Sequence, residues 1–474
     1  MTPAKRAAKR GARRTPVRKA VRAPRTTGEE MGQTLLAEAE RIVQRALALG
    51  ASQAEGFCEA GAGVQVELES DRIASTGASQ GSGRAVRLIA GGRVGFAYFT
   101  RAAELDGAIR LALAQAKHAP AKGYSLPMPG KAKALAGRWD ARIAALSVDD
   151  AIAAARDVLA GAKEGAPKAT VAGGGVGLDW GEVALASSQG VACHDRWTQA
   201  SVGASLVLQD GERSVSASES RDAHRFKIDG HAVALEAAET VVSLKGPKPA
   251  KAGRMDVVFR PEAVAELVVD LAVSAATGDE ARRGKTVWSE KLGAQVAARG
   301  LDLADDSRVA GAIGGAPFDD EGLPTSRLPI LEDGVLRNFI YDSWDAHEHK
   351  ATSTASAVRG GFKSRPEAGT HHVVLSSRSA RPTDKILAGV DDGYLVESVL
   401  GAHTANATTG DFSVTAPNVW RIRKGAVAGP AKEIALGGNL PDLLLRLDGV
   451  GKEAKRMDGL SIPVLRFQGM DVSV

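Results

Sequence analysis

The chain has 474 residues, of which 44% are hydrophobic and 25% charged, as in an ordinary globular protein. Its net charge of +5 comes from residues 1–28, which hold ten basic side chains and no acidic one; the remaining 51 basic and 56 acidic side chains give residues 29–474 a net charge of −5. A nucleic-acid-binding fold that is basic over its whole surface is therefore excluded, and two cysteines, Cys58 and Cys193, cannot build a disulfide framework in a chain of this length.

The distribution of apolar residues argues against a membrane protein. No apolar run approaches the roughly 20 residues that span a bilayer, and the N-terminus lacks the apolar segment of a signal peptide. We therefore expect a cytoplasmic protein whose cysteines stay reduced. Aromatic residues are only 4% of the chain, which argues against a surface of stacked bases.

Residues 1–28 form a basic tail. The segment has three prolines and few apolar side chains other than alanine, so it cannot bury enough surface to offset its ordering entropy, and we predict that it is disordered. Its charge could contact nucleic acid or an acidic partner weakly, or it could be a solubilising extension with no specific partner. A transit peptide is disfavoured because serine is absent before residue 52.

Residues 29–247 are predicted to form an N-terminal domain of helices and an antiparallel sheet. Helical spacing of leucine, isoleucine and valine predicts a first helix, which Thr26 or Thr27 caps and Gly50 ends. The other predicted elements are, in chain order, strands at 64–68, 84–90 and 93–100 with a turn at Gly91-Gly92, a helix at 102–117 capped by Thr100, a loop at 119–137, a helix at 148–163 capped by Ser147, an antiparallel meander over 169–228, and a helix at 231–244.

A linker at 248–253, rich in lysine, glycine and proline, leads to a β-rich C-terminal domain over 254–474. There we predict a strand at 255–259, a helix opening at Pro261, a hairpin across Asp333-Gly334, and short strands around 373–375, 394–399 and 419–423. Helices mixed with antiparallel hairpins, without a regular βαβ alternation, predict an α+β fold in both halves.

Two motif matches fail on their context. Gly77-Ala-Ser79-Gln-Gly81 matches a nucleophile elbow, which needs a strand, a sharp turn and a helix; here it lies in a Gly/Ser-rich loop that leads into a strand. Gly284-Lys285-Thr286 resembles the end of a phosphate-binding loop, but the required earlier glycine is Asp279, and a helix rather than a strand precedes it.

Two further clusters could bind a metal. His347-Glu348-His349 lacks the second ligand of a zinc helix, since positions 351 and 352 are Ala and Thr, and a solvated helix end is the favoured interpretation. His371, His372 and His403 could complete a site across the fold, but their spacing does not require it. Asp319-Asp320-Glu321 could bind a hard cation, although a solvated turn is favoured.

Four blocks in the C-terminal half resemble the TldD/PmbA family. They are Phe318–Thr325, Ile330–Asp342, Asn406–Ser413 and Gly437–Asp442, and they occur in the family's order, followed by a fitting Val450-Gly451 stretch. Members of this family are described as a two-component zinc metalloprotease and, historically, as modulators of DNA gyrase. The resemblance implies an N-terminal helix and antiparallel-sheet domain and a β-rich C-terminal domain of the TldD/PmbA type.

The family has two kinds of chain, and the resemblance assigns this one to the metal-free kind. TldD-like chains hold zinc with an H-E-x-x-x-H helix and a later cysteine. Counted back from Arg282-Arg283-Gly284, which resembles the "RRG" after that helix, the three key positions fall on Val269, Asp270 and Ser274, and no cysteine follows Cys193. The chain therefore looks like the PmbA/TldE subunit, with no catalytic or metal-binding residue of its own at these positions.

The implied function is that of a non-catalytic subunit that forms the substrate channel for peptides. Zinc is expected only in a TldD-like partner, with which this chain would form a heterodimer, although a homodimer fits equally well. Asp319, Glu321, Asn406 and Asp411 are the candidates for a substrate or partner surface. The alternatives are a stand-alone regulatory protein that uses its basic tail for an acidic or nucleic-acid partner, and an enzyme with a new metal site at His347, His349 or the 319–321 carboxylates.

Overall fold

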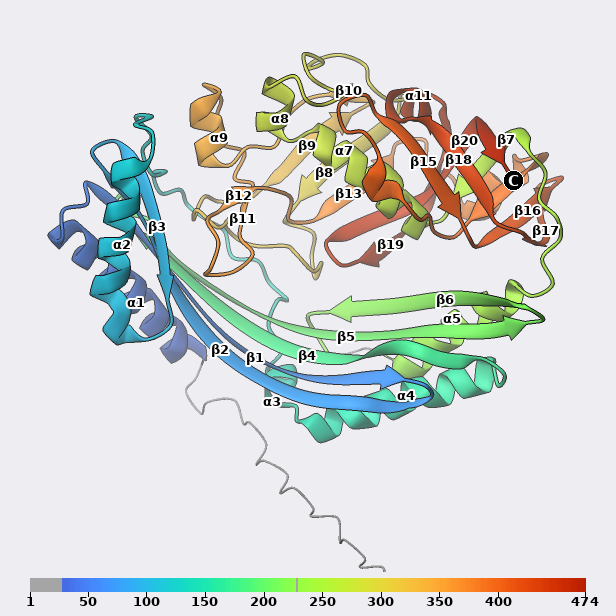
Figure 1. Cartoon of the computed structure of the whole chain (residues 1–474), viewed down its shortest axis with the longest axis horizontal. Helices are drawn as coiled ribbons and strands as arrows, with labels where there is room; N and C mark the ends of the chain where they lie inside the picture. The colour runs from blue at the N-terminus through green and yellow to red at the C-terminus, as the bar shows by residue number, and fades with distance from the viewer. Residues whose placement is uncertain (1–27, 227–228) are drawn as a thin grey trace, which may run out of the picture.

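A computed structural model describes residues 28–226 and 229–474, which fold into two halves (Figure 1). The N-terminal half is a long curved sheet with helices on its outer face, and the C-terminal half is a larger sheet with short helices, placed on the concave side. The predicted α+β class is confirmed. None of the described helices is long and apolar enough to cross a membrane.

The N-terminal half has one sheet of six antiparallel strands in the order β3-β2-β1-β4-β5-β6. Its elements are α1 (Gly28–Ala48), β1 (Gln53–Glu69), β2 (Arg72–Ala90), β3 (Arg93–Phe99), a 3-10 turn (Ala102–Glu104), α2 (Leu105–His118), α3 (Ala141–Ala145), α4 (Val148–Gly165), β4 (Thr170–Ser187), β5 (Ala192–Asp210), β6 (Arg213–Ala223) and α5 (Gly230–Ser243).

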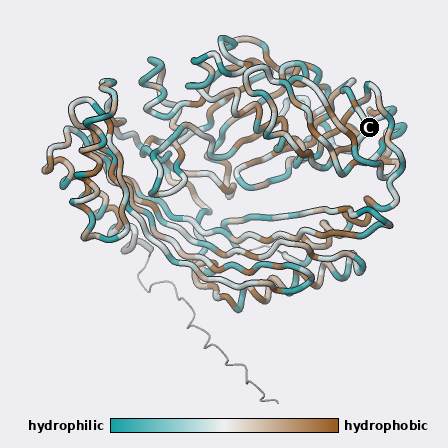
Figure 2. Tube along the Cα trace, viewed as in Figure 1, coloured by the Kyte–Doolittle hydropathy of each residue, from teal (hydrophilic) through white to brown (hydrophobic). Residues whose placement is uncertain are grey.

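Successive side chains of a strand point to opposite faces of the sheet, and one face of this sheet is covered by the helices. Val64, Val66 and Leu68 of β1 turn outward and join the core beneath α4 and α5, whereas Cys58, nearer the start of the strand, packs beneath α1 and α2. Glu55 and Phe57 of β1 point to the opposite face, where both contact Arg359 of the C-terminal half. In Figure 2, β6, the strand next to the C-terminal half, is drawn mainly in hydrophilic colours.

Helix α4 has the cap that its sequence predicts. The Ser147 hydroxyl accepts a hydrogen bond from the backbone N–H of Asp150, and Asp150 Oδ2 accepts one from the backbone N–H of Ser147 at 2.7 Å. This reciprocal pair is a capping box. It starts α4 at Val148, so that Ala151, Ala155 and Val158 are buried against the sheet.

The substitution Ser147→Ala should lower the free energy of unfolding by about 1 kcal/mol, because the first-turn N–H groups lose an acceptor. Denaturant unfolding of both proteins measures the difference. Ser376→Ala is the control, because Ser376 lies at an exposed position of the strand Val373–Ser377 and caps no helix; equal losses in the two variants would contradict the capping argument.

Three details differ from the sequence-based expectation. The 77–81 segment is not a loop: it lies within β2, paired with 61–65 of β1, because small residues do not prevent pairing where the backbone hydrogen bonds are complete. Thr100 is not a cap, since the first turn begins after Arg101. Thr26, Thr27 and the tail at 1–27 lie outside the described residues.

The C-terminal half is built around a sheet of twelve strands, mostly antiparallel. Its elements are β7 (Gly253–Phe259), α6 (Pro261–Ala263), a π-helical turn (Val264–Val269), α7 (Asp270–Ala275), α8 (Gly278–Arg282), β8 (Leu301–Asp306), β9 (Arg327–Glu332), β10 (Val335–Leu336), α9 (Ser343–Glu348), β11 (Ala357–Val358), β12 (Glu367–Ala368), β13 (Val373–Ser377), α10 (Thr383–Ala388), β14 (Asp392–Val396), a 3-10 turn (Ala402–Thr404), β15 (Asp411–Ala416), β16 (Val419–Arg423), β17 (Ala426–Ala431), β18 (Ile434–Asn439), α11 (Leu440–Leu445), β19 (Leu447–Met457) and β20 (Leu460–Ser473).

The two halves are joined along the edge of the long sheet as well as through the chain. Lys455 of β19 forms ion pairs with Glu219 of β6 and with Glu262, and Trp420 joins the core beneath α4 and α5. The segment at 248–253 contacts the C-terminal sheet, where Lys248 N–H donates to the Pro430 carbonyl at 3.1 Å. The proposed domain and linker boundaries stay predictions.

Candidate functional site

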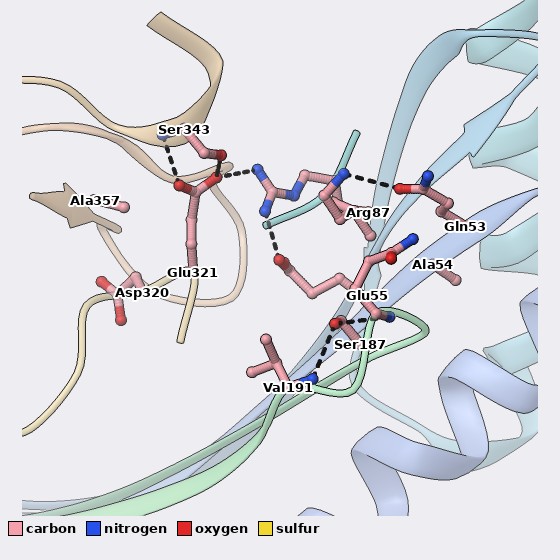
Figure 3. A network of polar contacts seen from close by, with 12 residues as sticks. Gln53, Ala54, Glu55, Arg87, Ser187, Val191, Asp320, Glu321, Ser343 and Ala357 are labelled. Atoms are coloured by element: carbon pink, nitrogen blue, oxygen red, sulfur yellow. Dashed lines mark hydrogen bonds and ion pairs between the residues drawn. The ribbon is translucent and has the colours of Figure 1, made fainter. Parts of the chain in front are cut away.

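A buried ion network joins the two halves (Figure 3). Arg87 of β2 lies at its centre: Nη2 is 2.5 Å from Glu55 Oε2 of β1, and Nη1 is 2.7 Å from Glu321 Oε1 of the C-terminal half. Arg359, which follows β11, donates from Nη2 to Glu55 Oε1. These four side chains are at most 4% exposed. Two positive and two negative charges thus neutralise one another away from water.

Ser343 and Tyr124 complete the shell around Glu321. The Ser343 backbone N–H donates to Glu321 Oε2 at 2.8 Å, its hydroxyl donates to Oε1 at 2.5 Å, and the Tyr124 hydroxyl lies 2.6 Å from Ser343 Oγ. Burial acts to raise the pKa of Glu55, but the guanidinium groups of Arg87 and Arg359 outweigh it and lower that pKa. Glu55 therefore stays ionised at neutral pH.

The acidic segment 319–321 is a buried turn, not the solvated turn that its composition predicts. Asp319 and Glu321 are each 1% exposed, which also removes them from the predicted substrate or partner surface. Asp319 accepts backbone N–H bonds from Glu321, Leu323 and Ala357. Burial, followed by the charge of Glu321, raises the pKa of Asp319 to about 7. The prediction failed because the partners that permit burial come from distant parts of the chain.

Asp342 lies at the edge of the network, where it caps helix α9. Its Oδ1 accepts the backbone N–H of Asp345 at 2.7 Å, and the residue is 3% exposed. Burial, followed by the charge of Glu321, raises the pKa of Asp342 to about 7. In the folded protein this carboxyl therefore holds its proton at pH values where an exposed aspartate has lost it.

The substitution Asp342→Asn should change how stability depends on pH. The contribution of the native carboxyl is present below its unfolded pKa and is lost as the pH rises through about 7. Asparagine caps the helix but does not titrate, so the variant's stability relative to the native protein should rise by up to about 1.4 kcal/mol per pH unit between roughly pH 4 and 7. Denaturant unfolding at a series of pH values tests this; a difference that stays constant would contradict the raised pKa.

The concave face of the long sheet carries a second feature, which we call the glycine trough. It has a volume of about 580 Å³, and its floor includes Gly61 and Gly63 of β1, Gly81 of β2 and Gly181 of β4. Gly61 is directly opposite both Gly81 and Gly181, so three strands each place a glycine in one row. Gly61 and Gly81 are at least partly exposed, whereas Gly181 is buried beneath the Trp197 ring. The rings of Trp197 and Phe362 are among its walls. A surface without side chains and with aromatic walls can admit an extended chain closely.

The helix after β7 carries the positions where the resemblance places the zinc motif. It contains a π-helical turn at Val264–Val269, a rare geometry that is frequent at functional sites. Val269 is 2% exposed, within the apolar core, whereas Asp270 and Ser274 are exposed. One carboxylate and one hydroxyl, with no imidazole or thiolate, do not fit the ligand set of a zinc site.

The 406–411 loop packs near the end of this helical region. Its Thr408 hydroxyl donates to the Lys285 carbonyl at 2.9 Å, and the Val287 N–H donates to the Ala407 carbonyl at 3.2 Å. Asn406 and Asp411 are exposed, and both shape the turn: Asn406 Oδ1 accepts the N–H of Thr408, and Asp411 accepts from Asn439. A role in contacting substrate stays a prediction for both residues.

The histidines of the possible new metal site do not come together. His347 Nε2 contacts the Lys122 carbonyl, His349 pairs with Asp279, and His371 pairs with Asp305; His372 contacts Ser461, and His403 is exposed. Over residues 28–226 and 229–474, no group of three or more His, Cys, Asp or Glu side chains is placed to hold a metal ion. Thr286 of the rejected phosphate-loop match is buried and donates to the Ala275 carbonyl.

Sequence reasoning missed the central residues of the network: Glu55, Arg87, Arg359 and Tyr124. Arg87 lies between Val86 and Leu88 in a strand that alternates, so it is expected to face solvent. No local signal reveals that the C-terminal half covers that face. An arginine and a glutamate on neighbouring strands are too common to indicate a buried pair.

Comparison with protein families matches the chain in three parts. Models of the PmbA/TldA metallopeptidase domains match residues 54–116 (domain 1), 141–245 (central domain) and 252–474 (C-terminal domain). Together they cover more than half of the chain. The long curved sheet and the β-rich half thus correspond to the domains of the PmbA/TldA metallopeptidase models, matched in chain order. The chain belongs to the TldD/PmbA family, which confirms the resemblance.

Individual relatives agree with this assignment. An uncharacterized protein of Methanocaldococcus jannaschii is 28% identical over 80% of this chain and 86% of its own length. Metalloprotease PmbA of Escherichia coli O157:H7 is 25% identical over 50% of this chain and 51% of its own length, so the chain matches about half of that relative. The crystal structure of TldE from Thermococcus kodakarensis superposes with a TM-score of 0.83 at 24% identity, covering 92% of this chain and 99% of that one, which establishes a shared fold.

Proposed function

We propose that this chain is the PmbA/TldE-like, non-catalytic subunit of a two-chain zinc peptidase. The observation that carries the proposal is the helix at 261–275. It belongs to a complete family fold, yet the zinc-motif positions hold Val269, Asp270 and Ser274. The zinc and the catalytic glutamate would come from a TldD-like partner.

In that complex, the glycine trough would form part of the channel for an unfolded or modified peptide. Its glycine-rich floor and aromatic walls suit an extended main chain, and its carboxylates, which include Glu59 and Asp179, could accept hydrogen bonds from peptide N–H groups. Burial raises the pKa of both carboxyls. This assignment gives the chain a role in holding substrate without a metal of its own.

The proposal is tested by comparing the chain alone with the chain co-expressed with a homologue that carries H-E-x-x-x-H. We expect about one zinc per heterodimer and cleavage of an unfolded peptide only in the co-expressed sample, with zinc measured by mass spectrometry. Stoichiometric zinc together with peptidase activity in the purified single chain would overturn the proposal. A stable, inactive homodimer that does not bind the homologue would contradict the proposed heterodimer.

A second candidate function is favoured by the ten basic residues of the tail. In this alternative the chain is a stand-alone regulatory protein whose tail contacts DNA or another acidic partner. DNA binding at two salt concentrations, with the native tail and with its basic residues replaced by glutamine, separates the two functions. Binding that is strong, salt-dependent and lost with the charges would support the regulatory role.

A further inference from the structure

A cavity of about 320 Å³ lies beside the ion network, between the two halves of the chain. Five carboxylate residues line it, two of them on α8, one at the N-cap of α9, one within α9 and one on β12: Asp279, Glu280, Asp342, Asp345 and Glu367. The basic residues in its walls are Arg87 and Arg365. Arg87 is already bound to Glu55 and Glu321, and Arg365 is exposed.

Three of these carboxylates have no positive partner among the described residues, and one of the three, Glu367, is exposed. Asp279 pairs with Arg283 and His349, and Glu280 lies 3.5 Å from Lys285. Asp342 and Asp345, by contrast, form no ion pair with any residue that the structure describes. Asp342 is more than nine-tenths buried, its Oδ1 holds the helix cap, and its Oδ2 has no hydrogen-bond partner within the described chain while the residue lines the cavity.

This arrangement is costly for the protein as it stands. Burial, followed by the charge of Asp279, raises the pKa of Asp345 to about 6, and the pKa of Asp342 is raised to about 7. Buried carboxylates are normally paired, because an uncompensated charge loses its hydration without gaining a partner. A cation entering the cavity would supply the positive charge that no described residue provides for Asp342 and Asp345.

The walls favour an organic cation over a metal ion. Tyr124 and Trp344 line the cavity and pack edge to face, with ring centroids 5.0 Å apart. Aromatic rings beside carboxylates attract ammonium and guanidinium groups. A metal ion needs several ligands converging on one point, and no such group of His, Cys, Asp or Glu is present in the described ranges.

We propose that this cavity is a binding site for an ammonium or guanidinium group, with Asp342 and Asp345 as its counter-charges and Tyr124 and Trp344 as its aromatic wall. Two sources carry this chemistry: a lysine or arginine side chain of a bound peptide, and the basic residues 1–28 of this chain. The site does not depend on the subunit role, because its charge and shape belong to this chain alone.

Calorimetry with the full chain tests the site, using the capped pentapeptide Ala-Ala-Arg-Ala-Ala as the probe. The matched peptide contains citrulline, which has nearly the shape of arginine without its charge. We expect the arginine peptide to bind at least about tenfold more tightly than the citrulline peptide, since a hydrogen bond to a charged group is worth roughly this factor. Raising the salt concentration should weaken binding of the arginine peptide.

The double variant Asp342→Asn/Asp345→Asn should lose this discrimination, with affinity for the arginine peptide reduced at least about tenfold. Asparagine at 342 keeps the helix cap, and circular dichroism checks the fold. Asp384→Asn is the matched control, since Asp384 is exposed in the first turn of the short helix α10, outside the cavity. Equal binding of the arginine peptide by the double variant and the native protein would overturn the proposal.

A full-length variant with glutamine at the ten basic tail positions identifies the source of the cation. Tighter peptide binding than in the native protein would mean that the tail competes for the cavity, and equal binding would mean that the cavity serves a separate peptide. Either result supports a cation site. Failure of the arginine peptide to bind both the native and the tail-neutral protein would overturn it.

Discussion

The substitution Arg87→Met is expected to lower the free energy of unfolding by about 3–5 kcal/mol, because breaking a buried ion pair leaves a charge without its partner. Methionine keeps the apolar stem but removes the guanidinium group. Glu55 would keep Arg359, whereas Glu321 would keep only neutral donors. Denaturant unfolding should be followed by two spectroscopic signals, since the two halves can separate in different steps.

Arg110→Met is the matched control for this change. Arg110 of α2 is 67% exposed and lies 3.7 Å from Asp106, so its loss should cost less than about 1 kcal/mol. Adding Glu321→Gln to Arg87→Met removes the stranded charge and should restore part of the lost stability. Equal costs for Arg87→Met and Arg110→Met would show that the network does not hold the two halves together.

The substitution Gly81→Trp should block the glycine trough and reduce peptide cleavage by the proposed two-chain complex at least about tenfold, if a productive complex requires the peptide to lie within the trough. A Cβ atom at Gly81 would meet nothing within 4 Å, so the strand backbone can accept a side chain there. The indole would then stand over the row formed with Gly61 and Gly181. Cleavage rates at several peptide concentrations measure the effect.

Gly77→Trp provides the comparison, because Gly77 lies on the same strand, also has open space around it, and is not among the residues that line the trough. Its cleavage rate should stay near that of the native complex. Zinc content and subunit assembly should be unchanged in both variants. A fully active Gly81→Trp complex would mean that substrate does not pass over this part of the sheet.

Much of the fold could be predicted because its signals are local. Ser147 and Asp150 form their capping box within one turn of helix, and Gly91-Gly92 and Asp333-Gly334 define hairpins within a few residues. The predicted strands at 64–68 and 84–90 are shorter than β1 and β2, because the small residues at 77–83 resemble a loop. Their strand geometry is imposed by pairing with β1, which no short window of sequence contains.

The candidate site was harder to predict, because its parts are far apart in the chain. Arg87 and Glu321 are separated by 234 positions, and Arg359 and Glu55 by 304. An acidic turn such as 319–321 is normally solvated. Its burial is possible here because Arg87 and backbone N–H groups bind its carboxylates. Family resemblance located the 318–325 block but could not identify which side chains face the N-terminal sheet.

The position of Arg87 has a consequence for assembly. A guanidinium group has a planar fork, and this one is fixed on one side by β1 and on the other by the turn at Glu321, so the orientation of one half relative to the other is set within the single chain. If the proposed two-chain complex forms, this chain would meet its partner with its two halves already oriented, and little conformational entropy would be lost on association. The trough floor would then keep one conformation, and different peptides would bind by changing their own conformation.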